Sequence, residues 1–175
     1  MIDLTKKALP NTITVDGKAY SIYTDYRLWL RFMIDVEEKQ AGFDVSYLFK
    51  NDMPPRISIN NLMEFASPRN ELPRKVEHSD EILLDFKLDS DLIYSAFMGQ
   101  YGIDLIEVNE MHWHKFLALL SGITNGTKLA DVMGYRSYNK NQKGDPYEKM
   151  KKAWKIEKIT ADNQKEAEEF EKLFI

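Results

Sequence analysis

The sequence predicts a mainly α protein with a small β component (α+β). We expect an N-terminal β-hairpin packed on a compact multi-helix domain, followed by a C-terminal amphipathic helical tail. Apolar residues recur at helical spacing in several stretches of the 175-residue chain, and capping residues, Gly or Pro bound each stretch. An Asp-Gly pair lies between two short alternating segments near the N-terminus, which is typical of a hairpin.

The N-terminal segment carries both the hairpin and the first helix. Residues 12–15 and 18–22 alternate apolar with polar side chains, and Asp16-Gly17 between them suits the positive φ angles of a type I′ turn. Thr24-Asp25 then predicts a helix N-cap. Apolar residues follow at i, i+3, i+4 and i+7, namely Tyr26, Trp29, Leu30 and Met33. Arg31 and Asp35 lie four positions apart, so we expect an ion pair on the opposite face.

The next stretch predicts two short helices and a linker. Residues 44–50 are consistent with a short helix, and residues 58–66 predict another that Ser67-Pro68 ends. Residues 69–79 are polar and contain Pro73, which indicates a linker or loop.

Residues 86–136 predict three further helices. The first begins at Asp89 or Ser90, runs to residue 100 and is followed by Gly102, which suits the left-handed C-terminal position. Asn109 is the expected cap of the next helix, which ends at Gly122. In the third, Thr127 caps a short helix that we expect Gly134 to end.

Residues 139–144 predict a break between two domains. We expect a hairpin plus helical core domain over residues 1–138 and a C-terminal helical tail over residues 139–175. Asp145-Pro146 suits the start of the tail's first helix. Near the end, an apolar stripe needs a surface to cover it, on this chain or another, and consists of Ala167, Phe170, Leu173 and Phe174.

Composition narrows the class of protein. A charged content of 30% and a net charge of -4 give no overall drive toward nucleic acid. No apolar run approaches the ~20 residues of a membrane span, and the first residues lack signal-peptide features, so we expect no membrane partner. The chain has no Cys, which excludes disulfides and Cys-ligated zinc and makes the cytoplasm the default compartment.

The charges are distributed unevenly. Residues 79–110 are strongly acidic, whereas residues 136–158 are rich in lysine. This asymmetry favours charge-complementary packing within one subunit or between neighbours. Tyr147 and Trp154 among the lysines leave a nucleic-acid contact open, but Glu148 and Glu157 dilute the positive charge. A solvated face or a protein contact is therefore favoured.

The sequence shows no constellation that points to catalysis or to a cofactor. On a helix, His112 and His114 would diverge by ~200°, so we expect no shared metal ion. Carboxylates that resemble acid/base pairs lie at helix starts, where capping is the better interpretation; they are Asp89 with Asp91 and Glu107 with Glu110. We expect no enzyme activity, no metal and no cofactor.

Several segments resemble one bacteriophage family, named after gene product fifteen of a Gram-positive siphophage. They are LDFKLDSDLIYSAFMGQYGIDL, MHWHKFLALLSGI and the closing MGYRS, together with TDYRLWLRF after the VDG hairpin. The resemblance runs from about Asn11 to Ser137. Where such proteins often show a Trp pair, this chain has Trp113-His114.

The resemblance implies a tail gene located ahead of that for the tape-measure protein. It implies a tail assembly chaperone in the cytoplasm of the infected host, with the tape-measure protein and tail-tube protein as partners, and we expect a homo-oligomer. The alternatives are a structural tail or connector protein retained in the virion, and a nucleic-acid-binding regulator that uses the lysine-rich tail.

Candidate partner-binding residues are mainly aromatic, because large rigid side chains dominate the energetics of interfaces. Phe170 and Phe174 are the first choice, since their stripe lacks an evident cover in the sequence. Aromatic and Met side chains with this spacing belong to the core more often than to a surface. The candidates are Trp113, Phe116, Arg136, Trp154, Phe170 and Phe174.

Overall fold

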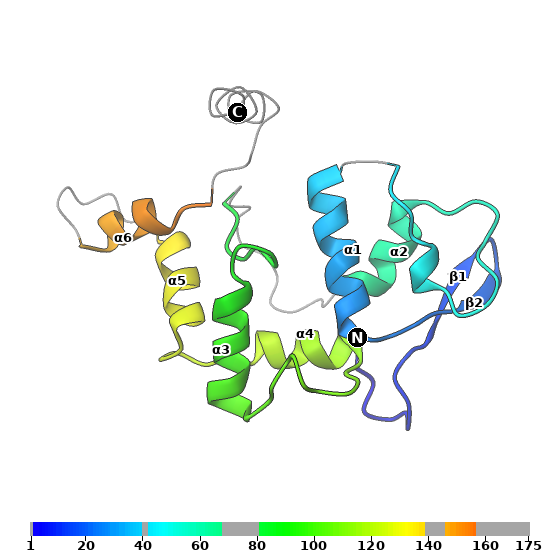
Figure 1. Ribbon diagram of the computed structural model, residues 1–175, viewed down its shortest axis with the longest axis horizontal. Coiled ribbons are helices and arrows are strands. Elements are labelled where there is room, and N and C mark those ends of the chain that lie inside the picture. Colours follow the sequence, from blue (N-terminus) through cyan, green and yellow to red (C-terminus); the bar gives the residue numbers. More distant parts are fainter. Residues whose placement is uncertain (1, 40–41, 68–80, 139–145, 157–175) are drawn as a thin grey trace, which may run out of the picture. The chain divides into compact units, whose positions relative to one another are not determined.

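The computed structural model describes residues 2–39, 42–67, 81–138 and 146–156. It confirms a mainly α protein with a small antiparallel sheet (Figure 1). Contacts group the chain into two compact units. The first comprises the described residues of Met1–Ser79 and Asp85–Asp131, and the second those of Asp80–Leu84 and Val132–Ile175. The division of the chain near residue 139 stays a prediction.

The N-terminal hairpin is present as predicted. Strand β1 (Thr12–Val15) pairs with β2 (Lys18–Ser21) in an antiparallel register that places Thr12 opposite Ser21. Asp16 and Gly17 form the turn with φ values of 51° and 77°, as a type I′ turn requires. The hairpin buries one face, and helix α2 packs against β1. That contact stabilises a hairpin that would be marginal alone.

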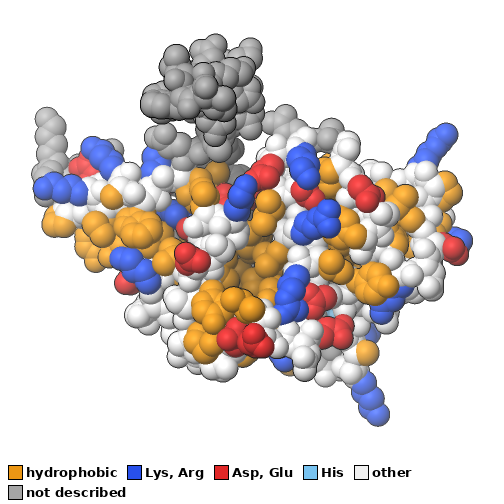
Figure 2. Space-filling view, viewed as in Figure 1, with side chains coloured by type: hydrophobic (Ala, Val, Ile, Leu, Met, Phe, Trp, Pro, Cys, Tyr) orange, Lys and Arg blue, Asp and Glu red, His pale blue; other side chains and the backbone are white. Residues whose placement is uncertain are grey.

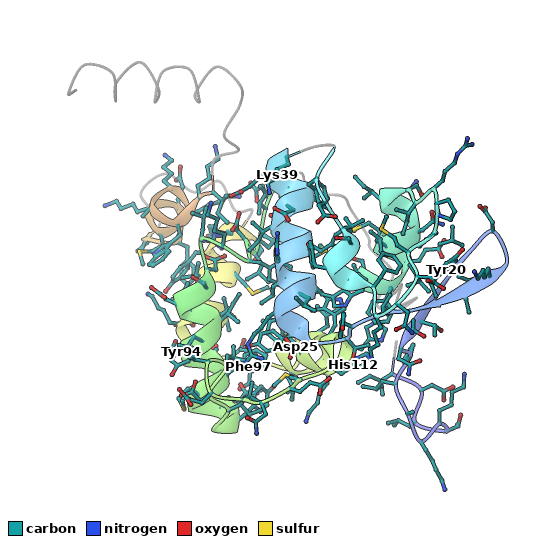
Figure 3. The ribbon with its side chains drawn as sticks, turned by 45° about the vertical axis from the view of Figure 1, so that its right-hand side comes forward. Tyr20, Asp25, Lys39, Tyr94, Phe97 and His112 are labelled. Atoms are coloured by element: carbon teal, nitrogen blue, oxygen red, sulfur yellow. The ribbon has the colours of Figure 1, made fainter. Side chains whose placement is uncertain are left out.

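Helices α1 (Tyr26–Lys39) and α4 (Trp113–Ser121) begin side by side, as Figure 3 shows for Asp25 and His112. The Tyr26 amide donates to the Met111 carbonyl at 2.8 Å, and the Trp113 amide donates to the Thr24 carbonyl at 2.7 Å. Each helix has a side-chain cap, since Asp25 accepts from the Arg27 amide and His112 accepts from the His114 amide.

The prediction that Asn109 caps α4 was wrong. The Asp104 carboxylate accepts from the amides of Ile106 and Glu107 and holds this stretch in a turn. The chain then runs extended alongside Thr24 and Asp25, so α4 begins only after His112.

Two of the remaining helices of the first unit match the sequence closely. Helix α2 (Ile59–Ala66) has a reciprocal capping box between Ser58 and Asn61. Helix α3 (Ser90–Tyr101) ends at Gly102 with φ 63°. Asp89 occupies the N-cap position of α3, but its carboxylate accepts from the Asp85 amide and does not cap the helix.

The short helix predicted over residues 44–50 is reduced to the 3-10 turn η1 (Ser46–Leu48). The Asp44 carboxylate accepts from the Ser46 amide, which favours a local turn. The Lys50 amide then donates to the Ser21 carbonyl, and Ile22 bridges Phe49, so the chain leaves the helical path to pair beside β2.

Helix α5 (Lys128–Arg136) begins with the predicted Thr127 cap, since the Ala130 amide donates to the Thr127 hydroxyl. The prediction that Gly134 ends it was wrong, because α5 continues to Arg136, a buried side chain. Anchoring of Arg136 outweighs the roughly 1 kcal/mol helix penalty of a glycine. Helix α6 spans Pro146–Trp154. The predictions for residues 69–79, 139–144 and 160–175 lie outside the described residues.

Aromatic side chains form the core of the first unit. Phe116 on α4 stacks on Phe97 of α3 at 5.1 Å and on Tyr26 of α1 at 4.8 Å between ring centroids. Trp113 stacks on Phe116 at 5.5 Å and donates its indole N–H to the Ala66 carbonyl. This stack joins α1, α3 and α4 around one centre and sets the positions of α1 and α3.

Candidate partner-binding groove

A groove of about 870 Å³ lies between α1 and α3 in the first unit. Figure 2 shows hydrophobic side chains gathered in this hollow. The α1 wall consists of Tyr26, Arg27, Leu30, Arg31, Ile34 and Asp35. The α3 wall consists of Phe86, Ser90, Asp91, Ile93 and Tyr94. Leu105, Ile106 and Phe116 complete the lining. The volume falls in the ~300–1,000 Å³ range of protein binding sites.

The bottom of the groove is apolar. Leu30 and Ile34 lie one helical turn apart on α1 and are half-buried, while Ile93 on α3 is buried. Ile106 on the rim is 74% exposed, which is unusual for so large an apolar side chain. A partner that covers these groups removes apolar surface from water at a gain of roughly 25 cal/mol per Å².

The two walls carry charges of opposite sign. On α1, Arg31 is 61% exposed at the side chain and lies 3.8 Å from Asp35, which also pairs with Lys39 at 2.6 Å. The Arg31 guanidinium also lies over the ring of Tyr47 at 4.2 Å. Burial raises the pKa of Tyr47 to about 12, so that ring stays a neutral phenol beneath the cation. On the opposite wall, α3 presents the exposed carboxylate of Asp91.

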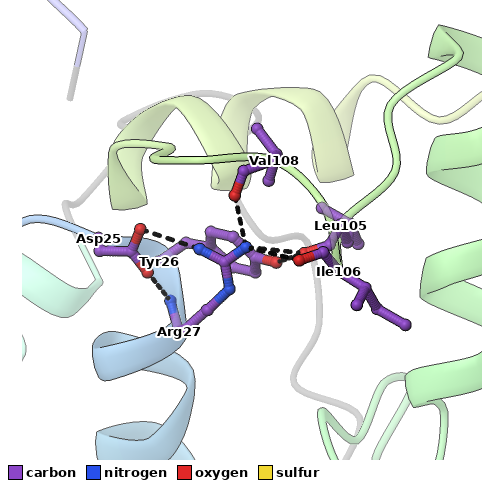
Figure 4. Close-up of polar contacts among 6 residues, drawn as sticks. All are labelled: Asp25, Tyr26, Arg27, Leu105, Ile106 and Val108. Carbon is purple, nitrogen blue, oxygen red and sulfur yellow. Dashed lines mark hydrogen bonds and ion pairs between the residues drawn. The ribbon is translucent and has the colours of Figure 1, made fainter.

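Arg27 clamps the loop that lines one end of the groove (Figure 4). Its Nη2 donates to three carbonyl oxygens, at 3.1 Å to Leu105, 3.3 Å to Ile106 and 2.6 Å to Val108. Its Nη1 lies 3.2 Å from the Asp25 carboxylate. The Tyr26 hydroxyl also donates to the Leu105 carbonyl. These contacts hold the loop against the first turn of α1 and present Ile106 at the rim.

The structure places two of the predicted contact residues inside the core. Trp113 and Phe116 are fully buried and belong to the aromatic stack beneath the groove. Phe116 lines the groove at its base. The pair therefore shapes this site from below.

Two other candidates, Arg136 and Trp154, meet within the second unit. Arg136 is buried, and its Nε donates to the Trp154 carbonyl at 2.7 Å, while its Nη1 donates to the Leu83 carbonyl at 3.0 Å. The Trp154 side chain is partly exposed. Arg136 thus ties together segments of this unit. Phe170 and Phe174 lie outside the described residues.

Charge complementarity between the acidic and lysine-rich segments appears within the second unit. Lys151 pairs with Glu81 at 2.7 Å and donates to the Tyr138 carbonyl. This ion pair agrees with the uneven charge distribution of the sequence.

His112 and His114 lie closer together than a helical pair would. Because His112 precedes α4 as its cap, the two ring centroids are 5.1 Å apart. His112 Nε2 is 2.8 Å from the Pro10 carbonyl, and His114 Nε2 is 2.9 Å from the Phe65 carbonyl. Burial lowers the pKa of both, that of His114 to about 4. Within the described ranges no group of three or more potential ligands gathers for a metal ion.

Sequence reasoning did not identify Arg27 or Ile106 as site residues. Ile106 belongs to the apolar connector 103–106, and four residues of this kind outside a helix were the available signal. Arg27 follows a capping Asp on a helix, where a basic side chain is unremarkable. Its role depends on carbonyls 78 to 81 positions away in the sequence.

The fold and site define a mainly α protein with an N-terminal hairpin and an apolar groove between two helices. The chain belongs to the Bacteriophage Gp15 protein family, whose model matches residues 5–161. Membership of this family indicates a structural or tail-related protein of a phage. Comparisons with curated proteins and with solved structures found no match. Among the described residues, no helix has the length and apolar character needed to cross a membrane.

Proposed function

We propose that this protein is a non-enzymatic tail assembly chaperone in the cytoplasm of the infected bacterium. It binds the tape-measure protein, tail-tube subunits or both while the tail is built, and it acts as a homo-oligomer. Family membership supports the setting in a phage. The observation that carries the binding role is the groove between α1 and α3, with its apolar bottom and exposed Ile106.

An apolar groove of this kind suits transient binding of unassembled protein. Apolar stripes of helices bind in hydrophobic grooves through side chains at i, i+3, i+4 and i+7. Several subunits along one long client would add avidity without a strong single contact. Weak individual sites would also allow release when the client is enclosed by the finished tail.

The charged groups beside the groove support a binding role over catalysis, because structural contacts already occupy them. Asp25 caps α1 and pairs with Arg27, whose guanidinium is bonded to loop carbonyls. Asp35 is shared between Arg31 and Lys39. These carboxylates are committed as acceptors, which favours their ionised form over the exchange of protons with a substrate.

Co-expression with the tape-measure protein tests the proposal. We expect a tagged version of this chain to keep the client soluble and to co-purify with it, and light scattering to show several copies per client. An insoluble client and no co-purifying complex would contradict the chaperone role.

Mass spectrometry of purified phage particles separates this function from a structural role. A chaperone leaves before the virion is complete, so we expect the protein to be absent. Its presence at a level comparable to other minor tail proteins would support a retained structural component instead.

A further inference from the structure

We propose that the groove binds one amphipathic helix of a client, with acidic side chains along one flank of its apolar stripe and basic side chains along the other. The acidic flank lies against Arg31 on α1, and the basic flank lies against Asp91 on α3. Ile106 is the apolar anchor at the end of the groove. This inference rests on the proposed function and adds the chemistry of the partner.

The construction of the walls favours a helix over an extended peptide. Both walls are helices, whose backbone N–H and C=O groups pair within the helix. An extended peptide would find no strand edge here, and its own backbone groups would lose hydrogen bonds to water on burial. A helix satisfies its backbone internally and needs only a surface for its apolar stripe.

The α1 wall attracts carboxylates. Arg31 is held at the rim by the Tyr47 ring, and the carboxylate nearest to it, Asp35, lies 3.8 Å away and makes its closer contact with Lys39. The Arg31 guanidinium therefore keeps donors for a second acceptor, since a guanidinium has five N–H groups.

The α3 wall attracts cations. Asp91 is exposed in the first turn of α3, and among the described residues it takes part in no ion pair. One turn further along, the Tyr94 hydroxyl donates to the Asp104 carboxylate, which adds negative charge to the same side. Walls of both signs disfavour nucleic acid, whose backbone requires positive charge throughout.

Ile106 is presented in a fixed position before any partner arrives. The three carbonyl contacts from Arg27 hold residues 105–108, so less conformational entropy is lost on binding. A fixed, exposed apolar side chain beside a groove has the character of an interface hot spot.

Three synthetic peptides test the charge pattern with the full-length protein. Each is about 18 residues long, or five helical turns, and carries the same leucine stripe and a fluorescein label. One has glutamates on one flank and lysines on the other, one has glutamates on both, and one has lysines on both. By fluorescence anisotropy we expect the mixed peptide to bind roughly threefold to tenfold more tightly than the others. Equal affinities would overturn the proposal.

Charge reversal in the protein makes the test specific to these residues. In Arg31→Glu both walls are acidic, so the all-lysine peptide becomes the tightest ligand. In Asp91→Lys both walls are basic, so the all-glutamate peptide does. Both side chains are exposed, and circular dichroism checks that each variant is folded. Preferences that do not change in either variant would overturn the assignment.

The anchor is tested by Ile106→Asp against Leu4→Asp, a matched change at a 94% exposed leucine that does not line the groove. We expect Ile106→Asp to weaken the mixed peptide tenfold or more and Leu4→Asp to have no effect. If Phe170→Asp with Phe174→Asp tightens peptide binding, the groove's occupant is the chain's own end. If Ile106→Asp changes the oligomer mass, the occupant is a second copy. Either result overturns the proposal.

The peptide experiment and the co-expression experiment fail separately. Peptide binding without charge preference, together with a soluble complex with the tape-measure protein, would remove this inference and leave the proposed function. Charge-selective peptide binding without any such complex would do the reverse.

Discussion

Replacement of Arg27 by Ala removes the clamp on the loop at residues 105–108. The substitution deletes the contacts from Nη2 to the carbonyls of Leu105, Ile106 and Val108, and the ion pair with Asp25. The Tyr26 hydroxyl bond to Leu105 remains. We therefore expect a loosened loop in a unit that still folds.

The magnitude follows from the geometry. Nη2 has two hydrogens for three acceptors, so at most two strong bonds are lost, and the shortest is that to Val108 at 2.6 Å. Hydrogen bonds to a charged group contribute ~1.5–3 kcal/mol each. The Arg27 side chain is 39% exposed, so water replaces part of the loss. We expect the free energy of unfolding to fall by about 2 kcal/mol.

Urea denaturation followed by tryptophan fluorescence measures the change, because Trp29 and Trp113 are buried in the same unit. Arg56→Ala is the matched control, since Arg56 is exposed, and we expect a change within about 0.5 kcal/mol. Arg27→Lys keeps the charge but cannot reach Asp25 and the carbonyls together, so it should behave more like Ala than like Arg. Equal midpoints for Arg27→Ala and Arg56→Ala would refute the clamp.

Three further predictions concern pH, the core and the turn. The pKa of His114 is about 4 when folded and ~6.5 when unfolded, so its contribution is complete above the unfolded pKa and is lost as pH falls from 6.5 toward 4. We expect the urea midpoint to fall between pH 7.5 and 5, and to fall less in His114→Gln; equal falls would contradict this. Phe116→Ala should lower the free energy of unfolding by ~3–5 kcal/mol, and an unchanged melting temperature would place Phe116 outside the core. Gly17→Ala should destabilise the hairpin by about 1 kcal/mol, because φ is 77°, whereas Gly99→Ala in α3 has open space and should stabilise by ~0.5–1 kcal/mol; calorimetry that gives both the same sign would contradict the assigned backbone.

Local chemistry made the hairpin and the first helix predictable. Asp16-Gly17 suits the turn because its conformation demands positive φ at both positions, and the structure has both. Spacing along α1 places Tyr26 and Trp29 on the buried face, as found. Such features depend on neighbours within a few positions.

Contacts between distant segments explain what the sequence could not predict. An apolar stripe on α4 indicates burial or binding equally well, and only the packing of α1 and α3 shows that Trp113 and Phe116 are covered. The start of α4 depends on pairing with residues near Thr24, nearly ninety positions earlier, so the local Asn109 signal misled. The groove arises from the same packing, and no short motif encodes it.

Photo-crosslinking from position 106 tests the central claim most directly. A benzophenone side chain at position 106 is introduced during co-expression with the tape-measure protein, and the same group at position 4 serves as the control. We expect the product from position 106 to contain the tape-measure protein, and position 4 to give little of it. Equal products from both positions, or crosslinks from position 106 only to other copies of this chain, would contradict a groove that binds the client.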